Sequence, residues 1–233
     1  MRTMELWLGA LGCAGLVAAL YAALLLAPAA VGESVAQRIL YLHAPSAFAA
    51  YGCIFVVAIA SALYLWKRSA AADRVAVAAA EVGVLMCTLV LVTGSIWGRA
   101  RWGAWWTPDP RLTLTLILWA IYLSYVLLRA FGGDDDEIAP YAAVLGIFGV
   151  LAIPAIRVSA RLMKGMHPSV LAPREGGGSG LADPYMKLAF WGGAVAMLLV
   201  AACLVLLRTR LERAERETMA LRRVADAAEG VAG

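Results

Sequence analysis

Long stretches without any charged residue constrain the fold of this chain most. No Asp, Glu, Lys or Arg occurs from Leu6 to Gly32 or from Ile39 to Trp66. About 20 apolar residues in a helix cross the hydrocarbon core of a bilayer. Only 15% of the 233 residues are charged and 63% are hydrophobic, whereas a soluble domain carries about a quarter of charged residues. The sequence therefore predicts an all-α integral membrane protein.

Six apolar segments predict six transmembrane helices within one membrane domain, residues 1–207. Their approximate ranges are 6–27, 46–66, 75–96, 112–128, 138–156 and 184–207. Residues 208–233 are rich in charges spaced four apart, such as Glu212 and Arg216, which favours a solvated helical tail. The first segment exceeds the 7–15 apolar residues of a secretory signal, so we expect a retained helix.

The number of spans places three connections on one side of the membrane. The connections after the first, third and fifth spans contain His43, the segment 97–113 and His167, and the chain has only two histidines. Lys and Arg are divided almost evenly between the two sides, so the positive-inside rule does not fix the orientation. A bound anion on the histidine side would explain the positive charge kept there.

The segment 97–113, WGRARWGAWWTPDPRLT, combines tryptophans with arginines. An aromatic belt at the membrane interface accounts for one or two tryptophans. Four in so short a segment favour a platform for a flat, conjugated ligand, because the indole offers a large apolar face and one N–H donor. The candidate residues of this segment are Trp97, Trp102, Trp105, Trp106, Arg99, Arg101 and Arg111.

The two histidines suggest what that ligand is. Neutral imidazole is a common iron ligand, and two imidazoles on opposite faces make a six-coordinate haem. We expect Pro45 in the first turn of the second span, with His43 just before it. Pro168 favours an extended backbone at His167. The alternative interpretation of each histidine is an ordinary polar residue at the membrane interface.

The basic residues on the histidine side suit the two propionates of haem, because guanidinium binds carboxylates bidentately. Arg99, Arg101 and Arg111 are the first candidates, whereas Arg38, Arg161 and Lys164 are weaker ones. The alternative for each is a solvated rim of charge.

Three further features have structural interpretations. Asp109 precedes Pro110 and is expected to cap the fourth span, with pairing to Arg111 as a second role. Glu81 lies inside the third span, where a carboxylate is a functional candidate, and it remains unassigned. The four cysteines are scattered one per apolar segment without a CxxC pair, which favours packing roles.

The segments RILYLHAPSAF (38–48) and LVTGSIWGRARWGAWWTPDPRLT (91–113), with His167 before the last span, resemble a known pattern. They are similar to the haem-handling proteins of cytochrome c biogenesis that carry a tryptophan-rich WWD segment, and most closely to the cytochrome c maturation protein C family. The resemblance covers nearly the whole chain. It implies haem b with His43 and His167 as axial ligands, above a platform that comprises Trp97, Trp102, Trp105, Trp106 and Asp109.

Two departures from the family pattern affect the platform. Pro108 stands where the family usually has another tryptophan. The sequence RLMKGMHP before His167 lacks the aromatic residues often found there, and Met163 or Met166 is a candidate to fill part of the gap.

The resemblance also implies a location and a function. It implies a bacterial inner-membrane protein, in contact with membrane lipid, with cytoplasmic termini and a periplasmic WWD segment. The protein would deliver haem to a periplasmic haem chaperone beside an ABC-type transporter complex, without enzymatic turnover and without nucleic acid. A cytochrome b-like electron-transfer subunit is the alternative, although no span has a histidine in its middle. A third alternative is a transporter that moves haem itself. The chain has no GxxxxGK[ST] nucleotide motif to drive such transport, so any ATP use would come from a partner.

Overall fold

The protein is described by a computed structural model that covers residues 2–29, 35–133, 135–162, 167 and 180–232. Every regular element among these residues is a helix. The elements are α1 (Arg2–Tyr21), η1 (Ala22–Leu26), η2 (Val35–Ile39), α2 (Leu40–Lys67), α3 (Ala70–Trp102), α4 (Pro110–Phe131), α5 (Asp135–Gly149), α6 (Ala152–Leu162), α7 (Pro184–Lys187), η3 (Leu188–Gly192) and α8 (Gly193–Ala232).

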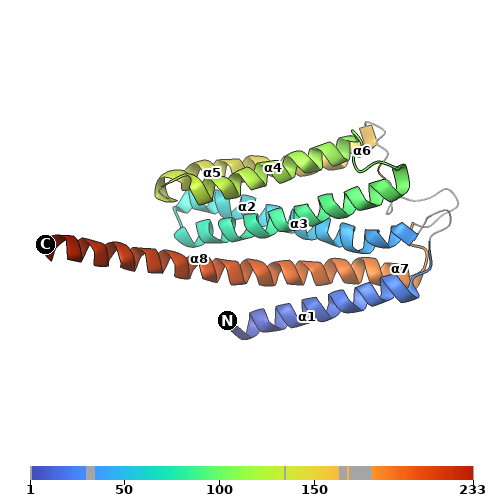
Figure 1. Ribbon diagram of the computed structural model, residues 1–233, viewed down its shortest axis with the longest axis horizontal. Coiled ribbons are helices and arrows are strands. Elements are labelled where there is room, and N and C mark those ends of the chain that lie inside the picture. Colours follow the sequence, from blue (N-terminus) through green and yellow to red (C-terminus); the bar gives the residue numbers. More distant parts are fainter. Residues whose placement is uncertain (1, 30–34, 134, 163–166, 168–179, 233) are drawn as a thin grey trace.

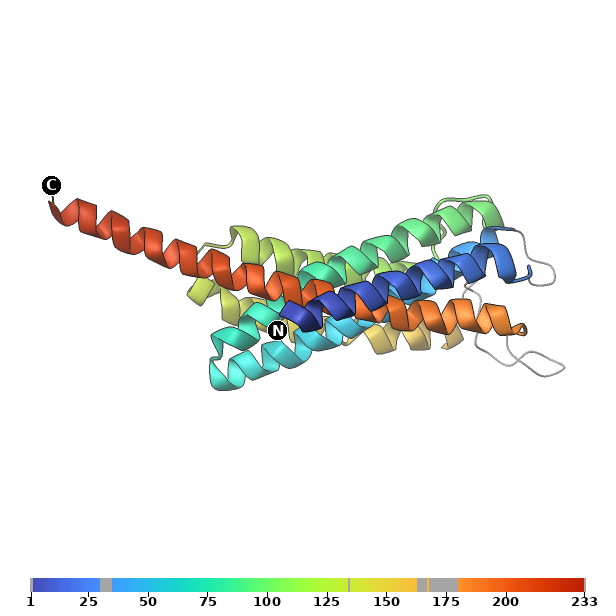
Figure 2. The same ribbon diagram turned by 90° about the horizontal axis from the view of Figure 1, so that it is seen from below.

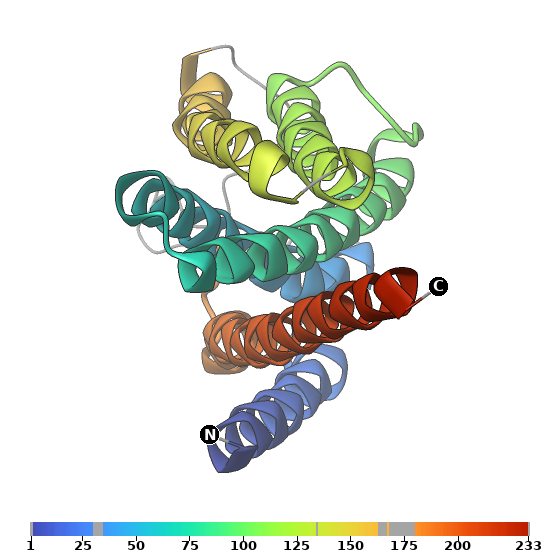
Figure 3. The same cartoon turned by 90° about the vertical axis from the view of Figure 1, so that its left-hand side faces the viewer.

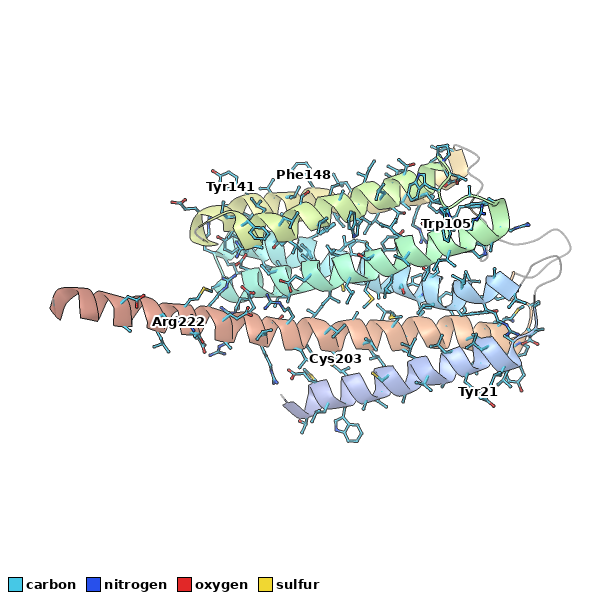
Figure 4. All side chains as sticks on the ribbon, in the orientation of Figure 1. Tyr21, Trp105, Tyr141, Phe148, Cys203 and Arg222 are labelled. Atoms are coloured by element: carbon cyan, nitrogen blue, oxygen red, sulfur yellow. The ribbon has the colours of Figure 1, made fainter. Side chains whose placement is uncertain are left out.

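Six helical stretches are long and apolar enough to cross a membrane, which confirms the predicted fold class. They cover Thr3–Leu26, Val35–Lys67, Ala70–Trp102, Pro110–Phe131, Glu137–Ser159 and Pro184–Met219. Large apolar side chains cover their outer surfaces. Tyr141 and Phe148 of α5 are 70% and 65% exposed and point away from the bundle (Figure 4). Such a surface suits lipid rather than water.

The helices are stacked in layers (Figure 3). α1 packs on α8, α8 packs on α2 and α3, and α4, α5 and α6 lie on the far side of α2 and α3. Both termini point toward the same end of the bundle (Figure 1). The C-terminal ends of α1, α3 and α6 lie at the opposite end, as Figures 1 and 2 both show. We call this opposite end the loop end.

Small residues bring α2 and α3 into close contact. Ala49 and Ala50 of α2 and Ala79 and Ala80 of α3 are fully or almost fully buried in one cluster. Gly83 of α3 lies against α2, where an added Cβ would stand 3.3 Å from the nearest Cβ. Small side chains let helix backbones approach closely inside a membrane. These two closely packed helices carry His43 and Thr93 of the candidate site.

Three of the four cysteines are buried and all four are free. Cys53, Cys87 and Cys203 lie in helix contacts, whereas Cys13 is exposed on α1. This placement agrees with the packing role expected from the sequence.

The start of the second span differs from expectation. α2 begins at Leu40, so Pro45 lies inside the helix and His43 lies within it rather than before it. A proline in an early turn removes only one helical hydrogen bond, here the one to the Tyr41 carbonyl. Tyr41 is 2% exposed and packs in a cluster with Phe190 of η3. This packing favours the earlier helix start.

The fifth span is broken into α5 and α6. Val150 donates its N–H to the Ile147 carbonyl at 3.3 Å instead of to Gly146. The Gly146 carbonyl accepts from the Tyr122 hydroxyl at 2.8 Å. Pro154 has no N–H for the Val150 carbonyl, which accepts from Ile153 at 3.1 Å. The break therefore follows from Pro154 and is stabilised by a tyrosine of α4.

Charged residues near the termini are paired across helices. The Asp73 carboxylate of α3 accepts from Arg129 of α4 at 2.9 Å and from Arg216 of α8 at 3.0 Å. The Asp73 and Arg129 side chains are 5% and 4% exposed. α8 is one continuous helix that is tied to its neighbours and then projects beyond the bundle (Figure 1).

Glu81, unassigned from the sequence, has a structural partner. Its two carboxylate oxygens accept from Arg208 of α8 at 2.5 and 3.0 Å. Glu5 of α1 pairs with Arg210 in the same stretch of α8. The third-span carboxylate therefore holds α8 in place and lies away from the loop end.

Candidate functional site

The two histidines of the chain lie side by side at the loop end. The His43 and His167 ring centroids are 6.2 Å apart, and their planes are inclined by 32°. His43 comes from α2, whereas His167 comes from the connection before the last span. The sequence predicted that the two histidines lie on the same side of the membrane, and in the structure their rings lie next to each other.

A threonine of α3 orients the His43 ring. The Thr93 hydroxyl donates its hydrogen to the Leu89 carbonyl at 2.5 Å. Its oxygen therefore accepts from His43 Nδ1, which lies 3.0 Å away. The neutral His43 ring then carries its proton on Nδ1 and keeps a free lone pair on Nε2. Metal-binding histidines are oriented in this way by a partner on the other ring nitrogen.

Gly94 allows the His43 ring to reach Thr93. A Cβ built on Gly94 would stand 3.2 Å from His43 Cε1 and 3.6 Å from Nδ1. The ring thus lies on the bare backbone of α3. The glycine in LVTGSIW belongs to the site, although sequence reasoning did not single it out.

His167 has an arginine as its partner. Arg111 Nη1 lies 3.0 Å from His167 Nδ1. Of the predicted arginines, Arg111 is the one that the described contacts place on a histidine, and it enters from the first turn of α4. The ring of Trp97 lies on another side of His167, with centroids 6.5 Å apart.

Two predicted tryptophans form a wall next to His167. The Trp97 and Trp102 rings meet edge to face at 5.0 Å between centroids. Gly98 lies directly against this pair, because a Cβ added there would stand 3.4 Å from the Trp102 ring. Gly103 then ends α3 with φ of 75°, a conformation that favours glycine.

The other predicted residues of the segment face outward. Trp105 and Trp106 are 61% and 41% exposed, and Trp105 lies at the loop end in Figure 4. Arg99 donates to the Gly103 carbonyl and so closes the turn after α3. Arg101 is exposed on the last turn of α3. The described contacts therefore bring Trp97 and Arg111 to His167, and Trp102 to Trp97.

Asp109 caps α4 as expected. Its Oδ1 accepts from the backbone N–H groups of Arg111 and Leu112 at 2.9 and 3.4 Å. Pro110 occupies the first helical position. The cap fixes where α4 begins, and therefore where the Arg111 side chain starts.

Several buried polar atoms around Arg111 have no hydrogen-bond partner among the described residues. They are Thr107 Oγ1, Asp109 Oδ2 and Arg111 Nε. Buried polar atoms are normally paired. Three unpaired ones in five residues indicate a place for a polar ligand group or water.

Sequence reasoning missed two polar neighbours of this place. Tyr51 of α2 and Arg157 of α6 are both within electrostatic range of Arg111. Helical spacing places Tyr51 two turns beyond His43, a signal that was available in the sequence. Arg157 depends on the break in the fifth span and was not identifiable from spacing.

The remaining weaker candidates are only partly described. Arg38 lies in η2 beside Tyr41. Lys164, Met163 and Met166 lie outside the described residues, as does the side chain of Arg161.

The distance between the two rings suits a metal-centred ligand. Metal–imidazole bonds of about 2 Å on each side of one iron place the two ring centroids about 6 Å apart. The observed 6.2 Å matches that separation. Tryptophan faces and a guanidinium beside the pair provide apolar and anionic recognition. The residues present therefore fit haem.

Comparison with known proteins also points to a haem-handling family. The sequence profile of the family described as heme exporter protein C matches residues 1–224. The chain belongs to the heme exporter protein C family. Heme exporter protein C of Bradyrhizobium diazoefficiens is 33% identical over 207 residues, which cover 89% of this chain and 78% of that protein. Heme exporter protein C of Escherichia coli K12 is 33% identical over 186 residues, 79% of this chain and 73% of that protein.

Family membership confirms the resemblance read from the motifs. The chain is a multi-pass membrane component of the haem export and cytochrome c maturation system. The histidine pair at the loop end is the feature of this chain whose geometry best fits haem.

Proposed function

We propose that this protein holds haem between His43 and His167 and passes it to a periplasmic haem chaperone. The observation that carries the proposal is the 6.2 Å separation of the two rings. The Thr93 contact supports it, because it leaves His43 Nε2 free to bind iron.

The surroundings divide into a holding part and an accessible part. Trp97, Trp102 and Arg111 contact the histidines or one another. Trp105 and Trp106 project outward from the same segment. Exposed indoles suit transient contact with a haem edge or with a protein that receives it. A site at the end of the bundle supports transfer rather than permanent storage.

The proposed setting is the bacterial inner membrane, with both termini in the cytoplasm and the loop end in the periplasm. ABC-type transporter subunits of the maturation system would supply any nucleotide-driven step. The paired charges of Asp73, Glu81 and Glu5 with α8 lie at the other end of the bundle.

A titration and a transfer assay test the proposal together. The purified protein in detergent is expected to bind one haem per chain with a low-spin, six-coordinate spectrum. Addition of the soluble domain of a periplasmic haem chaperone should then move haem to that domain. Two haems per chain, or haem that changes redox state but never leaves, would instead favour the cytochrome b-like electron-transfer subunit.

Gly94→Ala provides a steric test of the His43 pocket. The new Cβ would stand 3.2 Å from His43 Cε1 and would push the ring away from Thr93. Loss of such an orienting contact lowers metal affinity by 10–100-fold, and we expect about tenfold for haem. Gly192→Ala in η3 is the matched control, since its Cβ would lie 3.8 Å from its nearest neighbour. Equal haem affinity of the two variants would contradict the geometry described for His43.

A further inference from the structure

The two histidines of the site make hydrogen bonds of opposite sense. His43 Nδ1 donates to Thr93, so its proton is on Nδ1 and its Nε2 is free. A guanidinium has donors only. His167 Nδ1 must therefore accept from Arg111, and the neutral His167 ring carries its proton on Nε2. In this arrangement His43 is ready to bind a metal and His167 is not.

Arg111 is poorly matched by its present partner. A neutral imidazole nitrogen accepts one of its N–H groups, while Nε is buried without a partner among the described residues. The nearby Asp109 uses Oδ1 to cap α4, and Arg157 adds a second positive charge. A charge-assisted, bidentate bond to a carboxylate is roughly twice as strong as a bond to a neutral acceptor. The surroundings of Arg111 therefore favour an incoming carboxylate over His167.

We infer that Arg111 exchanges partners when haem binds: it holds His167 in the haem-free protein and a haem carboxylate in the loaded one. The inference rests on the proposed function. Once Arg111 turns to the carboxylate, its hydrogen bond to His167 Nδ1 is broken. The ring then shifts its proton from Nε2 to Nδ1, with no net gain or loss, and Nε2 becomes available to iron. Arg111 is thus a positioning residue that couples recognition of the carboxylate to readiness of the second ligand.

The contact with His167 is tested without haem. Diethyl pyrocarbonate reacts with an imidazole nitrogen that has a free lone pair, and mass spectrometry separates the only two histidines of the chain. Arg111→Leu is expected to raise the modification rate at His167 about tenfold, because a hydrogen bond to a charged donor is worth about 1.5 kcal/mol. The rate at His43 should stay unchanged.

Two matched variants separate the hydrogen bond from a general loosening of the loop. Arg111→Lys keeps a donor and should keep His167 slow. Lys187→Leu removes an exposed cation of α7 at the loop end and should also leave the rate unchanged. An Arg111→Leu protein that modifies at the wild-type rate overturns the inference, as does an equal acceleration in Lys187→Leu.

The second half of the exchange is tested with two porphyrins. Wild-type protein should bind haem about tenfold more tightly than iron protoporphyrin dimethyl ester, which lacks both carboxylates. Arg111→Leu should bind the two equally. If Arg111→Leu instead strengthens both by the same factor, Arg111 only blocks His167 and the exchange is wrong. If the wild type binds neither porphyrin while the His167 rate still responds, the proposed haem site fails and the exchange fails with it, although the apo contact stands.

Discussion

Replacement of either histidine by glycine is expected to weaken haem binding by at least about 100-fold, because even a residue that only orients a metal ligand contributes 10–100-fold to metal affinity. Removal of one of the two rings also leaves iron with a single protein ligand. The low-spin spectrum should therefore give way to a high-spin, five-coordinate one in both His43→Gly and His167→Gly. Absorbance titration of the purified variants in detergent measures both effects.

Added imidazole separates the loss of a ligand from the loss of the fold. A glycine leaves a cavity where the ring stood, so millimolar imidazole should restore the low-spin spectrum in each single variant. Tyr141→Phe on the outer face of α5 is the matched control and should behave as wild type. Haem that keeps an unaltered spectrum in both glycine variants would rule out the two-histidine site.

The histidines are not equivalent, and a third variant shows this. Thr93→Val keeps the size of the side chain but removes the acceptor for His43 Nδ1. We expect haem affinity to fall by about 10–100-fold while the coordination number is kept. The effect should be absent in a His43→Gly background, where Thr93 has no ring to orient.

The membrane fold was predictable because its main signal is local. Uncharged runs of sufficient length define spans, and six spans fix which connections share a side. The bend of the fifth span was not predictable in the same way. It depends on Pro154 together with the Tyr122 hydroxyl of α4. This hydroxyl donates to the Gly146 carbonyl, a contact that forms only once α4 and α5 pack together.

The residue types of the site were predictable, whereas their partners were not. Tryptophan, histidine and arginine signal their chemistry in the sequence. The choice of Arg111 rather than Arg99 depends on the Asp109 cap, which starts α4 beside His167. Arg99 instead closes its own turn at Gly103. Thr93 and Gly94 carry no such signal, since their importance comes from contact with a different helix.

The start of α2 shows how packing overrides a local signal. Pro45 suggests a helix start, but burial of Tyr41 extends the helix toward the loop end. This extension puts His43 on a regular helix. Its ring is therefore aimed by the helix as well as by Thr93, a more rigid arrangement than an irregular loop would give.

Asp73→Ala is expected to produce the largest loss of stability, about 3–5 kcal/mol, because it removes the carboxylate of a buried ion pair. Asp73 bridges Arg129 at 2.9 Å and Arg216 at 3.0 Å, and the Asp73 and Arg129 side chains are almost fully buried. Denaturant unfolding of the haem-free protein in one detergent measures the difference. The exposed pair Arg213–Glu217, 67% and 61% exposed, supplies the control: Glu217→Ala should cost less than about 1 kcal/mol.

A compensating variant distinguishes loss of the buried ion pair from a general packing defect. Asp73→Leu with Arg129→Met replaces the buried pair by apolar groups of similar size, which is often neutral or stabilising. We expect this double variant to regain most of the stability that Asp73→Ala loses, although Arg216 forfeits its contact with α3. Because this pair lies at the end of the bundle opposite the histidines, haem affinity of the folded protein should stay unchanged. Equal stability of Asp73→Ala and Glu217→Ala would show that the buried bridge does not hold α8 to the bundle.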